Sequence, residues 1–141
     1  VPFITQSAAG IRGALNVYGN DYPTPDGSAI RDYIHVLDLA QAHIIALERL
    51  MNNSHTSNME IFNLGTGKGS SVFEVIKAFE KASGEKLNYK IVGRREGDIT
   101  AAYADTKRAK DILKWESKKT LEDALKDAWR WQKKLGQRNS D

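Results

Sequence analysis

Arg31 and Tyr33 carry side chains suited to a phosphorylated ligand, and they stand close together on a segment expected to be extended. The loop before them, residues 19–28, contains Asn-Asp, two prolines and Asp-Gly, which are turn-forming residues. An arginine guanidinium binds phosphate oxygens through two parallel hydrogen bonds. A rigid loop that delivers an arginine and an aromatic side chain to one place predicts half of an anion-binding site.

A second group of polar side chains follows a predicted strand, in the sequence Arg94-Arg-Glu-Gly-Asp98. The forked guanidinium of arginine matches the geometry of a phosphate group, whereas the ammonium of lysine does not. The carboxylate of Asp98 can accept hydrogen bonds from a pair of ribose hydroxyls. Arg95 and Asp98 are therefore candidates to join Arg31 in one site. A surface loop with solvated charges is the alternative that the spacing leaves open.

The glycine-rich segment Gly65-Thr-Gly-Lys-Gly69 lies between a predicted strand and a helix start, where free backbone N–H groups commonly bind phosphate. A dinucleotide-binding loop needs a third glycine where Ser70 stands, and its next strand should end in an acidic residue, not in Gly93-Arg94. We therefore favour a tight turn that leads into a capped helix. A loop for NADP, with an arginine on its phosphate, is the alternative.

The segment Tyr103-Ala-Asp-Thr-Lys107 has the Tyr-x-x-x-Lys spacing of short-chain dehydrogenases, whose tyrosine and lysine project from one helix face. Asp105 is expected to cap the helix that follows, which would leave Tyr103 outside it. We interpret this match as a coincidence.

The three histidines, His35, His43 and His55, show no metal-ligand spacing with carboxylates, so we expect no metal site. We expect His43 to lie in the core, on the apolar face of its helix. His35 stands near the anion-binding loop, where we expect it to make a structural hydrogen bond.

The composition is that of an ordinary soluble domain, with 141 residues, 40% hydrophobic and 28% charged. A net charge of +3, from 21 basic and 18 acidic residues, is too small to indicate nucleic-acid binding. No stretch approaches the roughly 20 apolar residues of a membrane-spanning helix. The chain has no Cys, hence no disulfide and no thiolate metal site. We expect no nucleic-acid or membrane partner, and a cytoplasmic location.

Alternating helix and strand patterns predict a small mixed α/β domain with short strands, which packs on a larger domain. The expected strands are 15–18, 60–64 and 87–92, and residues 30–36 are expected to be extended. The expected helices are 3–11, 39–50, 72–83, 105–113 and 121–135, with caps at Asp38, Ser71, Asp105 and Thr120 and a stop at Gly84. The buried stripe expected in the last helix is Leu121, Ala124, Leu125, Ala128, Trp131 and Leu135.

Five segments occur in a distinctive order: Asn20-Asp-Tyr-Pro-Thr-Pro-Asp-Gly27, Arg31-Asp-Tyr-Ile-His-Val-Leu-Asp-Leu-Ala40, Asn63-Leu-Gly-Thr-Gly67, Arg94-Arg-Glu-Gly-Asp98 and Trp129-Arg-Trp131. Together they resemble the C-terminal part of UDP-glucose 4-epimerase, of the extended short-chain dehydrogenase/reductase superfamily. The resemblance covers nearly the whole chain. It implies an isomerase of galactose metabolism that interconverts UDP-galactose and UDP-glucose with tightly held NAD.

In that family a tyrosine base and the nicotinamide take a proton and a hydride from the sugar, which turns over before the hydride returns. The UDP must hold the substrate while the sugar turns, so binding energy from the non-reacting part positions the reacting part. The resemblance assigns seven residues to this anchor: Asn16 and Tyr18 to the uracil, Val72 to its apolar side, Arg31, Arg95 and Tyr33 to the diphosphate, and Asp98 to the ribose hydroxyls.

The family's NAD-binding glycine loop and its catalytic Ser and Tyr-x-x-x-Lys lie upstream of this region. We therefore expect residues 1–136 to be an isolated UDP-sugar-binding domain that has no catalytic residue, binds no NAD and is inactive alone. We expect residues 137–141 to be disordered, and the parent enzyme to be a homodimer with an N-terminal Rossmann domain.

Ala102 marks a position where a small residue in the family goes with room for an N-acetyl group. The resemblance therefore implies that UDP-N-acetylhexosamines are also substrates of the parent enzyme. Two alternatives to an epimerase are another nucleotide-sugar enzyme of the superfamily, such as a dehydratase or decarboxylase, and a non-catalytic nucleotide-sugar-binding module.

Overall fold

The computed structural model describes residues 1–138 and shows a small mixed α/β fold with short strands, as predicted. The helices are α1 (Pro2–Ala8), α2 (Val36–Met51), α3 (Val72–Ser83), the π-helix η1 (Ala109–Leu113) and α4 (Leu121–Arg138). The strands are β1 (Leu15–Tyr18), β2 (Ile30–Arg31), β3 (Ser70–Ser71), β4 (Tyr89–Val92) and β5 (Ala101–Ala102).

The strands form two small sheets. In the first, β1 runs parallel to β4, so that Leu15 pairs with Tyr89. In the second, β2 lies between antiparallel β3 and parallel β5, which sets Arg31 beside Ser70 and Ala102. Three segments that are far apart in the sequence therefore meet at Arg31.

The main core lies between β1, α1, α3 and α4. Val17, Phe79 and Leu125 are at most 1% exposed there, and the rings of Phe79 and Trp129 meet edge to face with centroids 5.7 Å apart. A smaller cluster holds α2 against η1 and is made of Ala42, Ala109, Leu113 and Trp115. The two clusters give the molecule two lobes.

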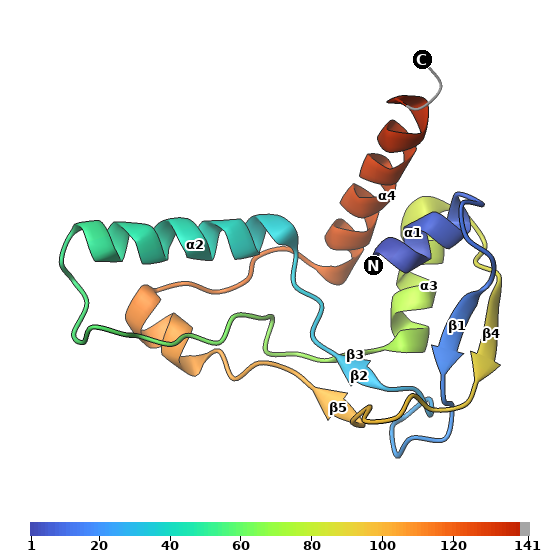
Figure 1. Ribbon diagram of the computed structural model, residues 1–141, viewed down its shortest axis with the longest axis horizontal. Helices are drawn as coiled ribbons and strands as arrows, with labels where there is room; N and C mark the ends of the chain where they lie inside the picture. The colour runs from blue at the N-terminus through green and yellow to red at the C-terminus, as the bar shows by residue number, and fades with distance from the viewer. Residues whose placement is uncertain (139–141) are drawn as a thin grey trace.

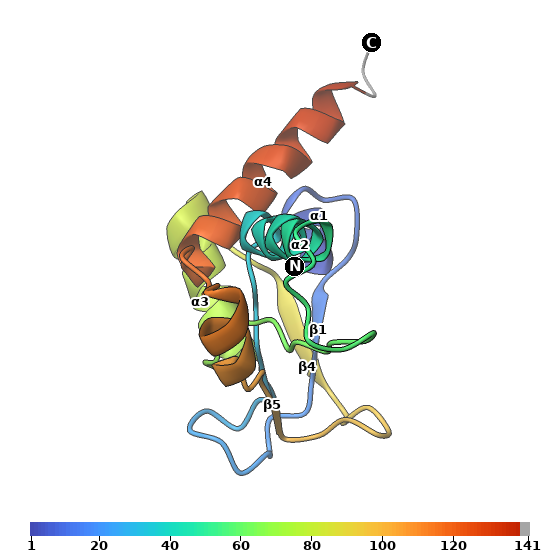
Figure 2. The same cartoon turned by 90° about the vertical axis from the view of Figure 1, so that its left-hand side faces the viewer.

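The two lobes are clear in the ribbon. Helix α2 lies at one end of the molecule and the β1–β4 pair at the other (Figure 1). Viewed along α2, helix α4 rises away from the rest of the chain (Figure 2). Because α2 packs against the rest of the molecule along one side only, its other faces are exposed to solvent.

Three of the predicted short-range signals for helix ends are confirmed. Ser71 and Glu74 form the predicted capping box, in which each side chain accepts from the other's backbone N–H, at 3.1 and 2.8 Å. Gly84 ends α3 in the left-handed conformation, with φ of 76°. Thr120 Oγ1 accepts from the N–H of Asp123 at 3.1 Å at the start of α4.

The predicted cap at Asp38 is wrong. Helix α2 begins at Val36, and its N-cap is His35, whose Nδ1 accepts from the N–H of Leu37 at 3.0 Å. Asp38 is buried, and its carboxylate accepts from two backbone N–H groups of the segment before α4, at 3.0 and 2.8 Å. A long-range contact therefore uses the carboxylate that the sequence suggested for the helix end.

Two predicted burial patterns are also wrong. His43 is exposed, because α2 buries only the narrow side that carries Asp38 and Ala42. Trp131 is 55% exposed, whereas Trp129 is 8% exposed, because the side of α4 that meets α3 passes through Leu125 and Trp129. Both errors concern which face of a correctly placed helix meets the core.

Three predicted element limits differ as well. Residues 60–64 form no strand, since they find no pairing partner within the described residues. Helix α1 ends at Ala8 rather than at Ile11, and Gly10 in the turn after it has φ of 70°. Residues 137 and 138, expected in a disordered tail, belong to α4. The rest of that expected tail, residues 139–141, lies outside the described residues.

Candidate functional site: a nucleotide cleft

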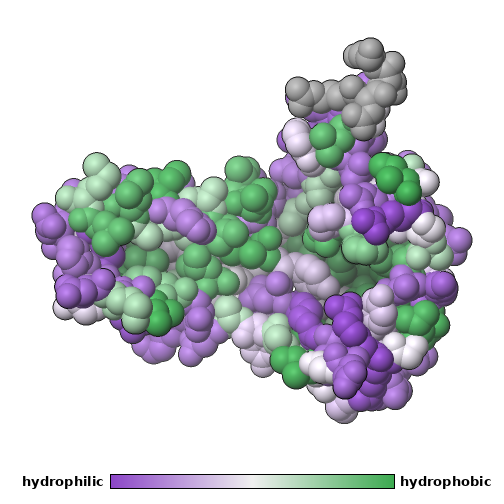
Figure 3. Space-filling model, viewed as in Figure 1, coloured by the Kyte–Doolittle hydropathy of each residue, from purple (hydrophilic) through white to green (hydrophobic). Residues whose placement is uncertain are grey.

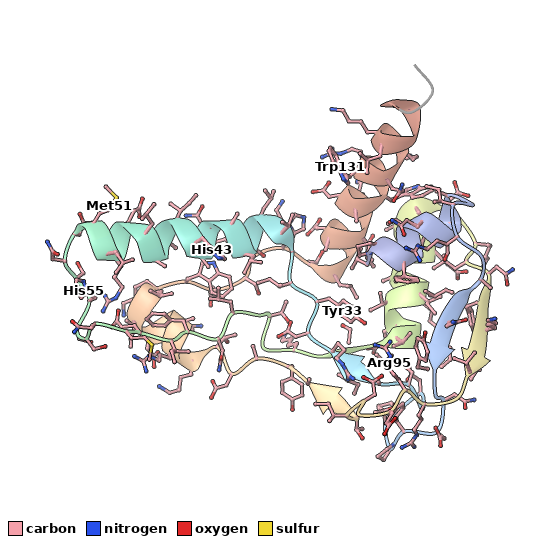
Figure 4. All side chains as sticks on the ribbon, viewed as in Figure 1. Tyr33, His43, Met51, His55, Arg95 and Trp131 are labelled. Carbon is pink, nitrogen blue, oxygen red and sulfur yellow. The ribbon has the colours of Figure 1, made fainter. Side chains whose placement is uncertain are left out.

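One cleft of about 540 Å³ brings together the residues assigned to UDP. Strand β1 contributes by its alternation: Leu15 and Val17 face the core, and Asn16 and Tyr18 face away from it. Figure 4 shows Tyr33 and Arg95 in this part of the molecule, far from His43 and His55. The seven assigned residues that line the cleft are Asn16, Tyr18, Arg31, Tyr33, Val72, Arg95 and Asp98.

Arg31 and Asp98 form an ion pair inside the cleft. Arg31 Nη2 lies 2.9 Å from Asp98 Oδ1, and Arg31 Nη1 donates to the carbonyl of Ile30 at 2.7 Å. The two side chains are 29% and 23% exposed, so the pair is partly shielded but still reachable. This contact joins β2 to the loop after β4 and fixes the guanidinium in place.

Arg95 stands over the ring of Tyr18, with its guanidinium carbon 4.5 Å from the ring centroid. Within the described residues, no carboxylate lies within ion-pair distance of Arg95. The neighbouring Arg94 differs, because it binds Asp21 at 2.8 Å and stacks on Tyr22 at 4.1 Å. Of the two adjacent arginines, Arg95 is the one whose charge is available in the cleft.

Tyr33 is half-buried between the cleft and the core. Burial raises the pKa of its phenol, and the nearby charge of Arg31 acts in the opposite direction without cancelling the effect. The hydroxyl therefore stays protonated at neutral pH. It can donate to an anionic ligand beside Arg31.

Ala102 lies next to the cleft without lining it. It pairs with Arg31 across β2 and β5, and its methyl group is partly exposed. The register of the sheet therefore places this small side chain beside the arginine.

Comparison with known proteins identifies the family. The family model described as GDP-mannose 4,6 dehydratase matches residues 1–128. The chain belongs to this family. UDP-glucose 4-epimerase 1 of Oryza sativa subsp. japonica is 51% identical over 95% of the chain, and that match covers 38% of the rice protein.

Solved structures agree with this assignment. A UDP-glucose 4-epimerase from Stenotrophomonas maltophila, with bound NAD and formylated UDP-arabinopyranose, superposes with a TM-score of 0.91 at 43% identity, over 97% of this chain and 40% of that one. The enzyme from Bifidobacterium longum, in complex with NAD+ and UDP, gives 0.88 at 43% identity, over 96% and 39%. The predicted resemblance to UDP-glucose 4-epimerases is confirmed, and the chain spans about two fifths of these proteins.

In this chain a carboxylate of the protein itself occupies the hydrogen-bond donors of the glycine-rich loop 65–69. The carboxylate of Asp32 accepts from the backbone N–H groups of Thr66, Gly67 and Ala104, at 2.9, 3.2 and 3.2 Å, and from Thr66 Oγ1 at 2.6 Å. The amides that would face a phosphate already hold a carboxylate. The structure therefore favours the tight turn over the dinucleotide-binding alternative.

The sequence did not reveal the end of the cleft formed by α1 and the turn after it. Arg12 lies 4.2 Å from the ring centroid of Phe3, and its Nε donates to Gln6 Oε1 at 2.5 Å. The hydroxyl of Ser7 is buried, with no hydrogen-bond partner among the described residues. Phe3, Ser7 and Arg12 all line the cleft. They carry no recognisable motif, and only the packing of α1 beside β1 brings them to the site.

The remaining patterns from the sequence have structural roles. Tyr103 lies outside any helix and Lys107 pairs with Asp111, so the Tyr-x-x-x-Lys match is coincidental. His35 makes the expected structural hydrogen bonds, to Leu37 and, through Nε2, to Asp127 at 3.3 Å. Within residues 1–138, no cluster of three His, Cys, Asp or Glu side chains could hold a metal ion. No helix in that range is long and apolar enough to cross a membrane.

Proposed function

We propose that this chain is the UDP-sugar-binding part of an NAD-dependent UDP-hexose 4-epimerase. The observation that carries the proposal is the convergence of the seven assigned residues, from four separate segments, on one cleft. A structure with a TM-score of 0.88 to this chain, solved in complex with NAD+ and UDP, supports the choice of nucleotide.

The cleft has the chemistry of an anchor for a nucleoside diphosphate. Arg31 and Arg95 supply two guanidinium groups for the diphosphate, and the Tyr33 hydroxyl can donate beside them. Tyr18 offers a ring face and Asn16 an amide for the uracil. Because these groups hold the nucleotide and not the sugar, the sugar is free to present either face to the reacting groups.

Asp98 has a second task in this proposal. In the structure it pairs with Arg31 at 2.9 Å. Its carboxylate has acceptor sites beyond that single contact, so it can bind ribose hydroxyls while it still orients the guanidinium. One residue then links recognition of the ribose to recognition of the diphosphate.

We place the NAD site and the catalytic residues outside this chain, on an N-terminal Rossmann domain of a longer protein. Within the described residues, the one glycine-rich loop of suitable position is filled by Asp32 and does not fit a dinucleotide phosphate. NAD supplies the redox chemistry of such enzymes, whereas the side chains described here hold the nucleotide. We further propose a homodimeric, cytoplasmic parent that acts in galactose metabolism.

The surface offers a place for that second domain. Hydrophobic residues gather over α2 in the space-filling view (Figure 3). Leu37, Ile44, Leu47, Leu50 and Met51 of α2 are each 49–73% exposed. A patch of this kind marks an interaction surface, and we assign it to the contact with the rest of the longer protein.

Calorimetric titration of the chain with UDP tests the anchor. We expect UDP to bind, and we expect Arg31→Ala to weaken it about 10-fold or more, because a charge-assisted hydrogen bond contributes about 1.5–3 kcal/mol. The purified chain should not turn over UDP-galactose. Absence of UDP binding, or turnover by the chain alone, would contradict the proposal.

The small side chain at Ala102 suggests a broader substrate range for the parent enzyme. A methyl group beside Arg31 leaves room where a larger residue would project. We propose that the full-length protein also accepts UDP-N-acetylhexosamines and that Ala102→Tyr lowers turnover of UDP-GlcNAc more than that of UDP-glucose. Equal losses with the two substrates would reject this role.

A further inference from the structure

We infer that Asp32 is a positioning residue for the UDP anchor, held by the glycine-rich loop 65–69 so that its neighbours Arg31 and Tyr33 face the cleft. The inference rests on the proposed function and concerns how the same site is built. Arg31 and Tyr33 line the cleft, whereas Asp32, which stands between them, does not.

Strand β2 cannot hold this segment by itself. It is only two residues long, Ile30–Arg31, and the backbone after Arg31 is outside the sheet until α2 begins at Val36. Two residues offer few ladder hydrogen bonds to hold the register, and a slip of one residue turns every side chain to the opposite face. Another contact must therefore fix which way residues 31–33 point.

The contacts of Asp32 meet this need. Its two carboxylate oxygens receive hydrogen bonds from Thr66, Gly67 and Ala104, which lie on two different segments. Successive side chains of an extended segment point to opposite sides. Fixing Asp32 on one side therefore directs Arg31 and Tyr33 to the other, where the cleft lies.

The loop is shaped around this carboxylate. A Cβ added to Gly65 would lie 2.3 Å from Asp32 Oδ2, and one added to Gly69 would lie 2.2 Å from Ile30 Cγ2. Gly67 has φ of 70°, which other residues rarely adopt. The glycines thus allow the loop to approach the β2 segment closely.

The charge of Asp32 is stabilised by neutral hydrogen-bond donors and not by its neighbour Arg31. Burial raises the pKa of Asp32, but the hydrogen bonds from Thr66, Ala104 and Gly67 outweigh it and lower the pKa overall. The carboxylate is therefore ionised and stabilised by neutral donors. It holds the segment without competing with the diphosphate for the Arg31 guanidinium.

The test compares UDP with uridine, because only UDP uses Arg31. We would titrate the chain and its Asp32→Asn variant with both ligands and follow binding by NMR chemical shifts. Asp32→Asn should lower UDP affinity by about 10-fold or more, the size of one hydrogen bond to a charged group, and leave uridine affinity nearly unchanged. Thr66→Val, which removes one donor and keeps the backbone hydrogen bonds, should act in the same direction and more weakly.

Asp38→Asn is the matched control. Asp38 also accepts from two backbone N–H groups, but it lies on α2 away from the cleft. The Asp38→Asn variant should be less stable than the parent chain but keep its ratio of UDP affinity to uridine affinity. An unchanged ratio in both Asp32→Asn and Thr66→Val would overturn the inference, whereas failure of the parent chain to bind UDP would overturn the proposed function itself.

Discussion

Arg94 and Arg95 show that two identical neighbours can have different roles. The guanidinium of Arg94 is taken up by Asp21, and this hydrogen bond lowers the pKa of that carboxyl. Arg95 turns the other way, over the ring of Tyr18 at the cleft. Charge and type are the same, so only the direction of the side chain decides which arginine meets a ligand.

Substitution of each arginine should separate these roles. Arg95→Ala is expected to weaken UDP binding by about 10-fold or more, because it removes a charge-assisted contact with the diphosphate. Arg94→Ala is expected to change UDP affinity by less than about 2-fold, since surface ion pairs contribute little. Isothermal titration of both variants checks this, and equal losses would refute the assignment of Arg95.

At the scale of elements, loops and not strands hold the site together. Strands β2, β3 and β5 have two residues each, so they offer few ladder hydrogen bonds. The glycine-rich loop binds Asp32. The loop after α2 is held against that helix by Glu60, whose carboxylate accepts hydrogen bonds from Nε and Nη2 of Arg49 at 2.7 and 3.0 Å. Stability should therefore be sensitive to changes in these loops.

Gly65→Ala tests the close approach of the glycine-rich loop. The added Cβ would lie 2.3 Å from Asp32 Oδ2 and 2.7 Å from Ala104 Cβ. We expect a loss of about 1–3 kcal/mol in the free energy of unfolding, as for other overpacked sites. Gly93→Ala, where nothing lies within 4 Å, should change it by less than about 1 kcal/mol. Urea unfolding measures both, and equal effects would show that the approach is not tight.

The Arg49–Glu60 pair predicts a loss of stability in acid. The hydrogen bond from Arg49, helped by Thr56, lowers the pKa of Glu60 from 4.5 to about 2. The folded state then favours the ionised carboxylate, so the stabilisation is complete above pH 4.5 and disappears as the pH falls towards 2.

Unfolding experiments across this pH range test the Glu60 pair. Glu60→Gln should unfold more easily than the parent chain at pH 7, and the difference should shrink between pH 4.5 and pH 2. Urea midpoints measured at several pH values give the comparison. A difference that is constant across this range would show that the charge of Glu60 does not matter.

At the scale of the whole molecule, α2 lies at one end and packs against the remaining chain along a single side. It buries Ala42 against η1, while Leu47 and Met51 remain 56% and 73% exposed. A chain with such a face tends to associate with itself when its natural partner is missing. This arrangement fits the proposal that a larger domain covers α2.

Leu47→Glu should therefore reduce self-association of the chain. A charge in the middle of the apolar face opposes its burial, whereas Ile91→Glu, at an exposed residue of β4 remote from α2, should have little effect. Light scattering coupled to gel filtration measures the mass of each variant. If the parent chain is monomeric at high concentration, the face does not associate in this way.

Local signals in the sequence predicted much of the fold. Strand β1, the capping box at Ser71, the stop at Gly84 and the cap at Thr120 all depend on residues within a few positions of each other. Arg31, Tyr33, Arg95 and Asp98 could be selected from the chemistry of their side chains and nearby turns. Asn16 and Val72 came only from the family resemblance.

The sequence by itself determined the residue types, the ends of α3, the start of α4 and the family, because each is written in short contiguous stretches. Tertiary structure decided which faces are buried and which charges are free: Trp129 and not Trp131, Arg95 and not Arg94. It also gave Asp38 and Asp32 partners more than 30 positions away. These outcomes depend on which distant segment packs beside a given side chain, and no local sequence pattern encodes that long-range contact.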